Sequence, residues 1–216
     1  MEQTTELFPK VFTWLFIGLL ITFVSGYALY LNESLLFSLM SSMSTLLIIV
    51  IVELVIAFVL SARIQKMNPV TMKVLYVIYC LITGLTFSSI FIVYEMGSII
   101  SIFLITALIF AVLAIYGHRT HRDLTKFGTI LIFTLLGILL AGIVNIFLQN
   151  SMLDLILTSL GVLIFMGYIA YDVQKIKTMV PYVGEEKAAV YGAFSLYLDF
   201  INLLIRLLQL FGKKND

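Results

Sequence analysis

Five polar residues fall on one face of an otherwise apolar segment near the end of the chain. The segment, residues 188–211, reads AAVYGAFSLYLDFINLLIRLLQLF. The five follow one another at steps of four, three, four and three residues, and they are Ser195, Asp199, Asn202, Arg206 and Gln209. At roughly 100° per residue, all five lie within a sector of about 80° on one helical face. Three of the five, Asp199, Asn202 and Arg206, are candidates to line an ion pathway.

The same segment is long and apolar enough to cross a bilayer. A charged side chain at the bilayer centre costs roughly 2.5–3.5 kcal/mol on insertion scales. A helix that faced lipid on all sides would not carry such a polar face. We therefore expect other helices to surround residues 188–211, with the polar face turned toward these helices or toward water.

Four charged residues lie inside hydrophobic segments of the chain, and a fifth lies at the edge of one. The four are Glu53, Asp172, Asp199 and Arg206, and the fifth is Arg63. Depths counted at about 1.5 Å per residue put Arg63, Asp172 and Asp199 in the same half of the membrane. We expect these three side chains to meet, with helix tilt or a longer sixth segment absorbing the depth difference of about two turns between the aspartates.

A pair of aspartates in a low-dielectric interior has a defined chemistry. Both carboxylates cannot ionise cheaply, so the pair shares a proton, while a nearby Arg63 favours the ionised form. One proton then decides whether the helices of Asp172 and Asp199 attract or repel each other. The pair is a candidate pH sensor and gate. The alternative is a satisfied polar network that only fixes the register of the helices.

Glu53 and Arg206 each allow more than one interpretation. Glu53 lies ten residues before Arg63, which is about 15 Å deeper in the membrane. It is a structural hydrogen-bond partner, a proton carrier or a cation ligand. Arg206 follows Asp199 by seven residues, about 10 Å along the axis, which is too far for a direct bond. Its side chain either belongs to the polar pathway or extends to the membrane surface.

The composition predicts an integral membrane protein. The chain has 216 residues, of which 62% are hydrophobic and 12% are charged, whereas soluble domains carry about 25% charged residues. A net charge of +1 points to no nucleic-acid partner. The single cysteine, Cys80, excludes a disulfide within the chain, and no cofactor is expected.

Seven segments satisfy the length of about 20 residues that a hydrocarbon core of about 30 Å requires. They cover residues 11–31, 36–62, 70–94, 99–116, 127–148, 152–173 and 188–211. The connections are short, so we expect a single all-α membrane domain over residues 1–216. The second segment is either one long tilted helix or a helix that begins with a serine-rich interfacial turn at residues 38–44.

Lysine and arginine are confined to alternate connections, which predicts the orientation. The basic stretches are residues 63–73, 119–126 and 175–187, and the other connections carry Glu33, Glu95 and Asp154. The basic side is expected to be cytosolic, with residues 1–10 inside and the tail, residues 212–216, outside. Lys213 and Lys214 disagree with this orientation. Either the tail is an exception, or the last helix does not cross completely.

Five stretches carry a family resemblance. They are FSLYLDFINLL at residues 194–204, GYIAYDVQKI at 167–176, ELVIAFVLSAR at 53–63, GIVNIF at 142–147 and HRDL at 121–124. Together they resemble the Bax inhibitor-1 family, also called the transmembrane Bax inhibitor motif family, and the resemblance covers essentially the whole chain. The chain length and brief loops resemble a bacterial member, which implies a multi-pass protein of the bacterial plasma membrane.

The resemblance implies more than the residues alone do. The family has seven helices, with the last one central and the other six wrapped around it, and its members are associated with a pH-sensitive calcium leak. The matching motifs put the aspartate pair of the family on Asp172 and Asp199, its arginine on Arg63, and its acidic residue of the second span on Glu53. The charged tail of animal members is missing here, so roles of that tail and cell-death partners are not carried over.

These observations favour a passive Ca²⁺ leak channel over an enzyme. Ca²⁺ prefers six to eight oxygen ligands, so Asp172, Asp199 and Glu53 with carbonyls and water would form a weak site. The expected ion pathway is Glu53, Asp199, Asn202 and Arg206. Ca²⁺ is the permeant ion rather than a cofactor, and the expected partners are the lipid bilayer, Ca²⁺ and protons.

Two other functions remain open from the sequence. A proton-coupled transporter would also use buried carboxylates, although the chain has no evident inverted repeat and no helix broken by Gly and Pro at mid-membrane. An aspartyl intramembrane protease would need its second aspartate in a Gly-x-Gly-Asp setting, but Asp199 is preceded by Tyr197 and Leu198.

Overall fold

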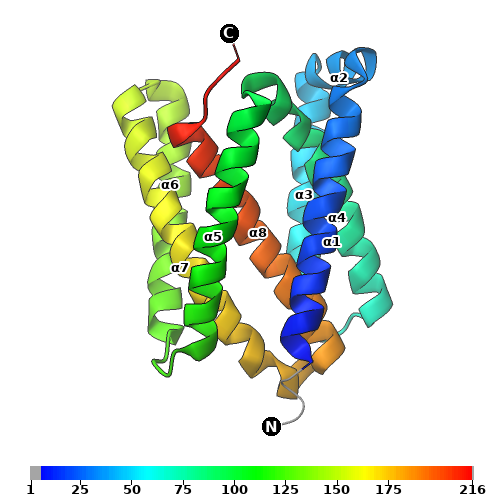
Figure 1. The fold of residues 1–216 in the computed structure, drawn as a ribbon, viewed down its shortest axis with the longest axis vertical. Coiled ribbons are helices and arrows are strands. Elements are labelled where there is room, and N and C mark those ends of the chain that lie inside the picture. The colour runs from blue at the N-terminus through cyan, green and yellow to red at the C-terminus, as the bar shows by residue number, and fades with distance from the viewer. Residues whose placement is uncertain (1–5, 216) are drawn as a thin grey trace. The chain divides into compact units, whose positions relative to one another are not determined.

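The structure is a computed structural model that describes residues 6–215. Within these residues the chain forms eight α-helices (Figure 1). They are α1 (Leu7–Tyr30), α2 (Glu33–Met40), α3 (Met43–Ala62), α4 (Pro69–Val93), α5 (Met96–Arg119), α6 (Thr125–Leu148), α7 (Ser151–Val183) and α8 (Glu185–Phe211). The expectation of a cytosolic segment at residues 1–10 falls partly outside the described residues.

Seven of these helices are long and apolar enough to cross a membrane, which confirms the seven predicted spans. The exception is α2, with eight residues. The predicted segment at residues 36–62 is therefore not one long helix, because the chain breaks at residues 41–42. Ser42 caps the start of α3, since its side chain accepts a hydrogen bond from the Thr45 N–H at 3.3 Å. A serine-rich turn was the second of the two predicted alternatives.

Short polar side chains also cap the starts of α2 and α7, because they satisfy N–H groups that have no partner within the helix. Asn32 accepts from the N–H of Leu35 at the start of α2, and Asn150 accepts from the N–H of Leu153 at the start of α7. Before α6, the Thr125 side chain and N–H both hydrogen-bond to Asp123 and lower the pKa of its carboxyl below the usual value.

Helix α7 extends ten residues beyond the predicted end of its span at residue 173. It has 33 residues, a length of about 50 Å, against a hydrocarbon core of about 30 Å. Its last three turns carry Lys175, Lys177 and Pro181, so the apolar pattern ends while the helix continues. Gly184 separates α7 from α8 with a φ of 82°, a left-handed conformation that glycine adopts without steric cost.

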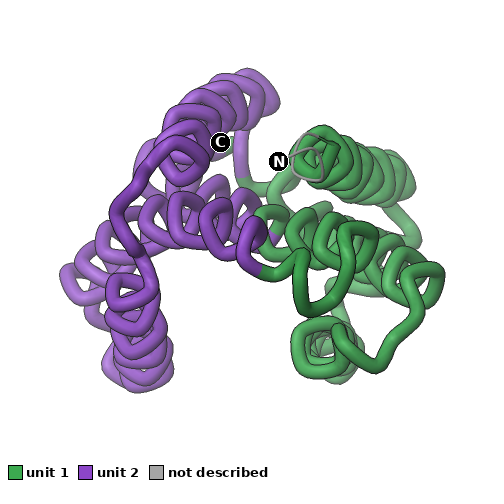
Figure 2. Tube along the Cα trace, turned by 90° about the horizontal axis from the view of Figure 1, so that it is seen from below, with its two compact units in different colours: residues 1–93, 179–197, 215–216 green, residues 94–178, 198–214 purple. Residues whose placement is uncertain are grey.

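The chain divides into two compact units, which Figure 2 colours green and purple. The described part of unit 1 comprises residues 6–93, 179–197 and 215, and unit 2 comprises residues 94–178 and 198–214. Helix α8 therefore gives its first half to unit 1 and its second half to unit 2. Each unit is described separately below.

Unit 1 is built on a close pair of helices, α1 and α4. A Cβ atom added at Gly26 would lie 2.7 Å from the carbonyl oxygen of Gly84, so the absence of side chains lets the two backbones approach. The first half of α8 packs against this pair. Two aromatic rings of α4 each meet two rings of α8 edge to face, at centroid distances of 5.2–6.3 Å. The rings belong to Tyr76, Tyr79, Phe194 and Tyr197.

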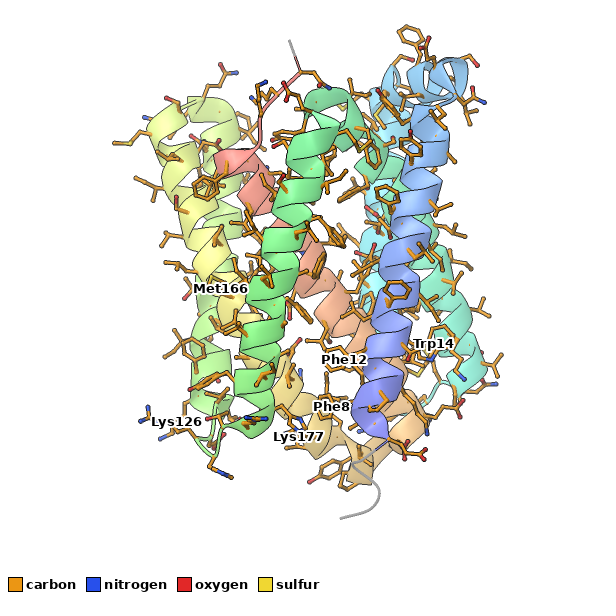
Figure 3. The ribbon with its side chains drawn as sticks, viewed as in Figure 1. Phe8, Phe12, Trp14, Lys126, Met166 and Lys177 are labelled. Atoms are coloured by element: carbon orange, nitrogen blue, oxygen red, sulfur yellow. The ribbon has the colours of Figure 1, made fainter. Side chains whose placement is uncertain are left out.

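Unit 2 contains α5, α6, most of α7 and the second half of α8. A core of four buried aliphatic side chains joins α6 to α7, and it consists of Leu131, Ile138, Leu157 and Ile164. A Cβ at Gly117 would lie 2.3 Å from the carbonyl oxygen of Ala170, so α5 and α7 also meet through a glycine. Lys126 and Lys177, both labelled in Figure 3, lie at the same end of this unit, called here the basic end.

Helix α8 is the most buried of the seven spans, as expected for a central helix. Within its most hydropathic window 72% of residues are buried, against at most 44% in any other span. In unit 1 its first turn pairs Glu185 with Lys10 of α1 at 2.6 Å. In unit 2 Lys213, just after its end, pairs with Glu95 before α5 at 2.5 Å. Since α5 runs from Glu95 to the basic end, the last turn of α8 lies at the opposite end of unit 2. The orientation of the tail with Lys213 and Lys214 stays a prediction.

Candidate ion-binding site in unit 2

The two aspartates predicted to meet lie in the same unit, on adjacent helices. Asp172 is on α7 with 9% of its surface exposed, and Asp199 is on α8 with 5% exposed. The two are close enough for their charges to interact. Around them the helices are apolar, with Ile169 and Val173 fully buried beside Asp172. The structure therefore has an acidic pair in a buried, largely apolar interior.

The carboxylate of Asp199 is incompletely satisfied. Its Oδ2 atom is buried and has no hydrogen-bond partner among the residues that the structure describes. Besides Asp172, the ammonium of Lys175 acts on its charge. The phenol of Tyr168 is within electrostatic reach of both carboxylates. A buried polar group that lacks a partner is costly in a purely structural network, so the arrangement suits a site that exchanges a proton or an ion.

Two polar and small-residue stripes face each other along α7 and α8 of unit 2. On α7 the stripe recurs at steps of four, three, four, three and four residues: Asp154, Thr158, Gly161, Phe165, Tyr168 and Asp172. On α8 it is the predicted polar face from Asp199 to Gln209. The stripes run antiparallel, because Asp172 interacts with Asp199 while Gly161 contacts Arg206. We call this facing pair of stripes the α7–α8 seam.

The remaining predicted residues of α8 lie along this seam. The amide of Asn202 donates to the Leu198 carbonyl at 2.7 Å and is partly buried. The guanidinium of Arg206 donates to the side chain of Gln209 at 3.1 Å. Exposure rises along the face from the buried Asp199 to the exposed Gln209, so the polar face leads from the acidic pair to the end of the unit that lies opposite the basic end.

Glu53 and Arg63 belong to unit 1, where both lie on or beside α3. Glu53 is half-buried at mid-helix and lies near the Thr83 hydroxyl of α4, which also has Tyr79 and Tyr197 as neighbours. No hydrogen bond of ordinary geometry reaches that hydroxyl among the described residues. Arg63 is the exposed C-cap of α3. The predicted contact of Arg63 with the aspartate pair, and the predicted place of Glu53 on the same ion pathway, stay predictions.

No three His, Cys, Asp or Glu side chains within residues 6–215 form a group that could hold a metal ion. A dedicated calcium site of six to eight oxygens is therefore not preformed by carboxylates in the described part of the chain. The weak Ca²⁺ site expected at Asp172, Asp199 and Glu53 stays a prediction, and carbonyl and water oxygens would have to complete it.

Two residues beside the aspartates were missed by reasoning from the sequence. Tyr168 carried no functional prediction, and Lys175 was counted only within the basic stretch at residues 175–187. The signal was their spacing from Asp172, since Tyr168 precedes it by four residues and Lys175 follows it by three. Such spacings bring side chains to the same helical face. Lys175 also lies over the Tyr171 ring, with its Nζ 5.7 Å from the ring centroid.

Seven apolar helices and a buried acidic pair define a multi-pass helical membrane protein. The family model described as "Inhibitor of apoptosis-promoting Bax1" matches residues 4–216, and this chain belongs to that family, the Bax inhibitor-1 family. Two of the relatives described next are named as membrane proteins, and neither their names nor the family description includes an enzymatic activity.

Bacterial relatives match over nearly their whole length. The chain is 41% identical to "Inner membrane protein YbhL" of Escherichia coli strain K12, over 95% of this chain and 90% of the relative. It is 37% identical to an uncharacterised protein of Borreliella burgdorferi, over 96% and 91% respectively. It is 33% identical to an uncharacterised membrane protein of Streptococcus pyogenes serotype M3, over 98% and 93%. The chain is therefore a multi-pass bacterial membrane protein.

Proposed function

We propose that this protein is a passive Ca²⁺ leak pathway that is gated by protonation of the Asp172/Asp199 pair. The observation that carries the proposal is the buried Asp199 carboxylate, which has Asp172 as its electrostatic neighbour and an Oδ2 atom without a hydrogen bond in the described structure. The family resemblance suggests the calcium leak, and the close approach of the two carboxylates supports a proton-sensitive element within a span.

The gate follows from the charges that face Asp199. With one proton shared, the pair carries one negative charge and a carboxyl O–H that can donate to the other carboxylate. With both groups ionised, two like charges face each other in low dielectric and repel. Lys175 and Tyr168 are the neighbours able to compensate the second charge. Protons and Ca²⁺ therefore compete for the same oxygens.

The proposal includes the two predicted residues of unit 1 through the resemblance. Arg63 is the cation that would favour the ionised pair, and Glu53 is a second carboxylate along the pathway. Asn202 and Arg206 continue the pathway on α8. The proposed orientation has the N-terminus in the cytosol, because the basic connections then lie inside.

The test is Ca²⁺ entry into dye-loaded proteoliposomes at several pH values between about pH 6 and 8, without any energy source. We expect wild-type flux to vary with pH, which gives the direction of the gate, and Asp172→Asn and Asp199→Asn to abolish most of this variation. Asn keeps the size of the side chain but neither ionises nor bridges a proton to a carboxylate. Asp123→Asn is the matched control, since Asp123 is exposed in the α5–α6 loop.

Two results would contradict the proposal. One is flux no greater than that of empty liposomes at every pH, with the protein shown to be folded. The other is a pH profile that is unchanged in both aspartate variants. Uphill Ca²⁺ movement driven by a proton gradient would instead indicate a proton-coupled transporter. Cleavage of a helical membrane peptide that either substitution abolishes would indicate a protease.

A further inference from the structure

A pocket opens at the end of unit 2 that lies away from the basic end. Its volume is about 420 Å³, and it is lined by the first turns of α7 and the end of α8. The polar lining residues are Ser151, Asp154, Thr158 and Gln209. A water needs roughly 10–15 Å³ of such volume, so a cation fits here with its hydration shell. Asp154 is the carboxylate of this lining.

The pocket shares three of its lining residues with the α7–α8 seam. Asp154 and Thr158 begin the α7 stripe that leads to Asp172, and Gln209 ends the α8 stripe that begins at Asp199. A cation that entered the pocket would therefore meet polar groups along the seam in the direction of the acidic pair. Between pocket and pair, the first charged side chain on this line is Arg206.

The side chain of Arg206 has one partner on its own helix and two neighbours on α7, across the seam. It donates to Gln209 at 3.1 Å, and Asp154 acts on its charge. Its Cγ, Cδ and Nε atoms lie against α7, at 3.2–3.4 Å from the place that a Cβ of Gly161 would occupy. Because Gly161 has no side chain, the arginine lies against α7. The backbone position of Arg206 is about 10 Å along the helix from that of Asp199.

We infer that this pocket is the cation entrance of unit 2, with Asp154 as its attracting carboxylate, and that the Arg206 guanidinium is the electrostatic barrier between the pocket and Asp199. A fixed positive charge in a narrow low-dielectric passage repels cations and sets their rate of entry. The inference rests on the proposed function, because it assigns the entrance of the same pathway.

The barrier is measured by thiol labelling, which needs no ion flux. Cys80 is the only cysteine of the chain, so Cys80→Ala gives a background without thiols. Asn202→Cys then adds one thiol on the far side of Arg206, and Ser151→Cys, in a separate protein, adds one in the pocket. Proteoliposomes receive membrane-impermeant methanethiosulfonate reagents, one cationic and one anionic. The Ser151→Cys protein reports how many molecules face outward.

We expect Arg206→Gln to speed cationic labelling at position 202 about tenfold or more, the scale at which a local charge changes ion entry. The same substitution should leave the labelling rate of the Ser151→Cys protein unchanged, and it should not increase the rate of anionic labelling at position 202. Arg206→Lys keeps the charge and should keep labelling slow. Asp154→Asn should slow cationic labelling at both positions. Arg119→Gln, which removes a charge from the basic end, is the matched control and should change neither rate.

Unchanged cationic labelling in Arg206→Gln would overturn the inference. Equal acceleration by Gln and Lys would also overturn it, because the side-chain packing rather than the charge would then be the obstacle. If Arg206→Gln does not fold, Gly161→Ala is the second variant, since its methyl group displaces the arginine and should give a smaller acceleration. Absence of Ca²⁺ flux would defeat the proposed function without affecting these rates, and pH-gated flux with unchanged labelling would defeat the barrier alone.

Discussion

The two halves of α8 bury different kinds of polar group. In unit 1 the first half uses neutral hydroxyls, and the Tyr197 hydroxyl is 2.6 Å from that of Thr22 inside a set of edge-to-face aromatic rings. In unit 2 the second half carries Asp199, whose buried Oδ2 has no hydrogen-bond partner among the described residues. The Thr83 hydroxyl beside Tyr197 also has no hydrogen-bond partner among the described residues, but it is neutral. The contrast is therefore between neutral polar groups in the first half and an ionisable one in the second.

This difference indicates that the first half stabilises the fold, while the second half carries a group that can exchange a proton or bind a cation. A neutral, hydrogen-bonded aromatic cluster gains packing and loses little when pH changes. A carboxylate in the same kind of environment is unfavourable unless a proton, a cation or a partner compensates it. We therefore expect substitutions in unit 1 to lower stability, and substitutions at Asp199 to change function while stability is kept or raised.

The largest effect on stability is expected for Tyr197→Ala. Tyr197 is fully buried and packs against both Tyr76 and Tyr79. Removing a large buried aromatic side chain costs about 3–5 kcal/mol in protein cores. Thermal unfolding in detergent, followed by circular dichroism, should show a strongly lowered midpoint. The matched control is Tyr182→Ala, because 80% of Tyr182 is exposed. Equal midpoints for the two variants would contradict a structural role for the first half of α8.

The second prediction concerns Asp199→Asn, which should leave stability unchanged or raise it. The substitution removes a buried charge and the repulsion by Asp172, and a buried ionic group is often replaced at no cost or with a gain of 1–4 kcal/mol. Stability in detergent near pH 8, where an ionised pair repels most, should be unchanged or raised. A loss of several degrees would show that Asp199 is part of a satisfied structural network, which is the alternative that the sequence left open.

Much of this contrast could be predicted from the sequence, and the reasons differ between elements. The seven spans follow from hydropathy, and the positions of Asp172 and Asp199 follow from helical periodicity combined with the family motifs. A longer sixth segment was one of the two alternatives, beside helix tilt. Its length could not be predicted, because residues 174–183 are too polar for a membrane span although they continue the helix. The hydrogen bonding of one carboxylate oxygen could not be predicted, since it depends on the packing of several helices.

The proposed entrance at the end of unit 2 was not predicted, although Asp154 had already been noted in the sequence. Asp154 was used only as a marker of a connection without basic residues, and Gly161 was not considered. Both lie on the same face of α7 as Asp172, because steps of four and three residues lead from Asp154 through Gly161 to Asp172. The same spacing had predicted the polar face of α8. What the sequence lacked was the partner of that face, because periodicity gives the face of a helix but not the neighbour that it meets.

The smallest effect concerns the Tyr197 hydroxyl, and the direction of its hydrogen bond makes it informative. The Thr22 hydroxyl donates to the Cys80 carbonyl at 3.0 Å. A hydroxyl has one proton, so Tyr197 must be the donor in its bond with Thr22. Tyr197→Phe removes that donor and leaves Thr22 bonded to Cys80. Its cost should be near the average of about 0.6 kcal/mol for interhelical hydrogen bonds in membrane proteins.

Thr22→Val should cost more, because it leaves the Tyr197 hydroxyl buried without its acceptor, a loss of about 1–3 kcal/mol. The same Thr22→Val change made in a Tyr197→Phe protein should cost less, since no donor is then stranded. Midpoints of thermal unfolding for the four proteins of this cycle measure the coupling. Equal costs for the two single variants would mean that the Tyr197 hydroxyl turns to Thr83, the neighbouring hydroxyl in the cluster. The neutral half of α8 would then be adaptable rather than fixed, and the contrast with Asp199 would rest on charge alone.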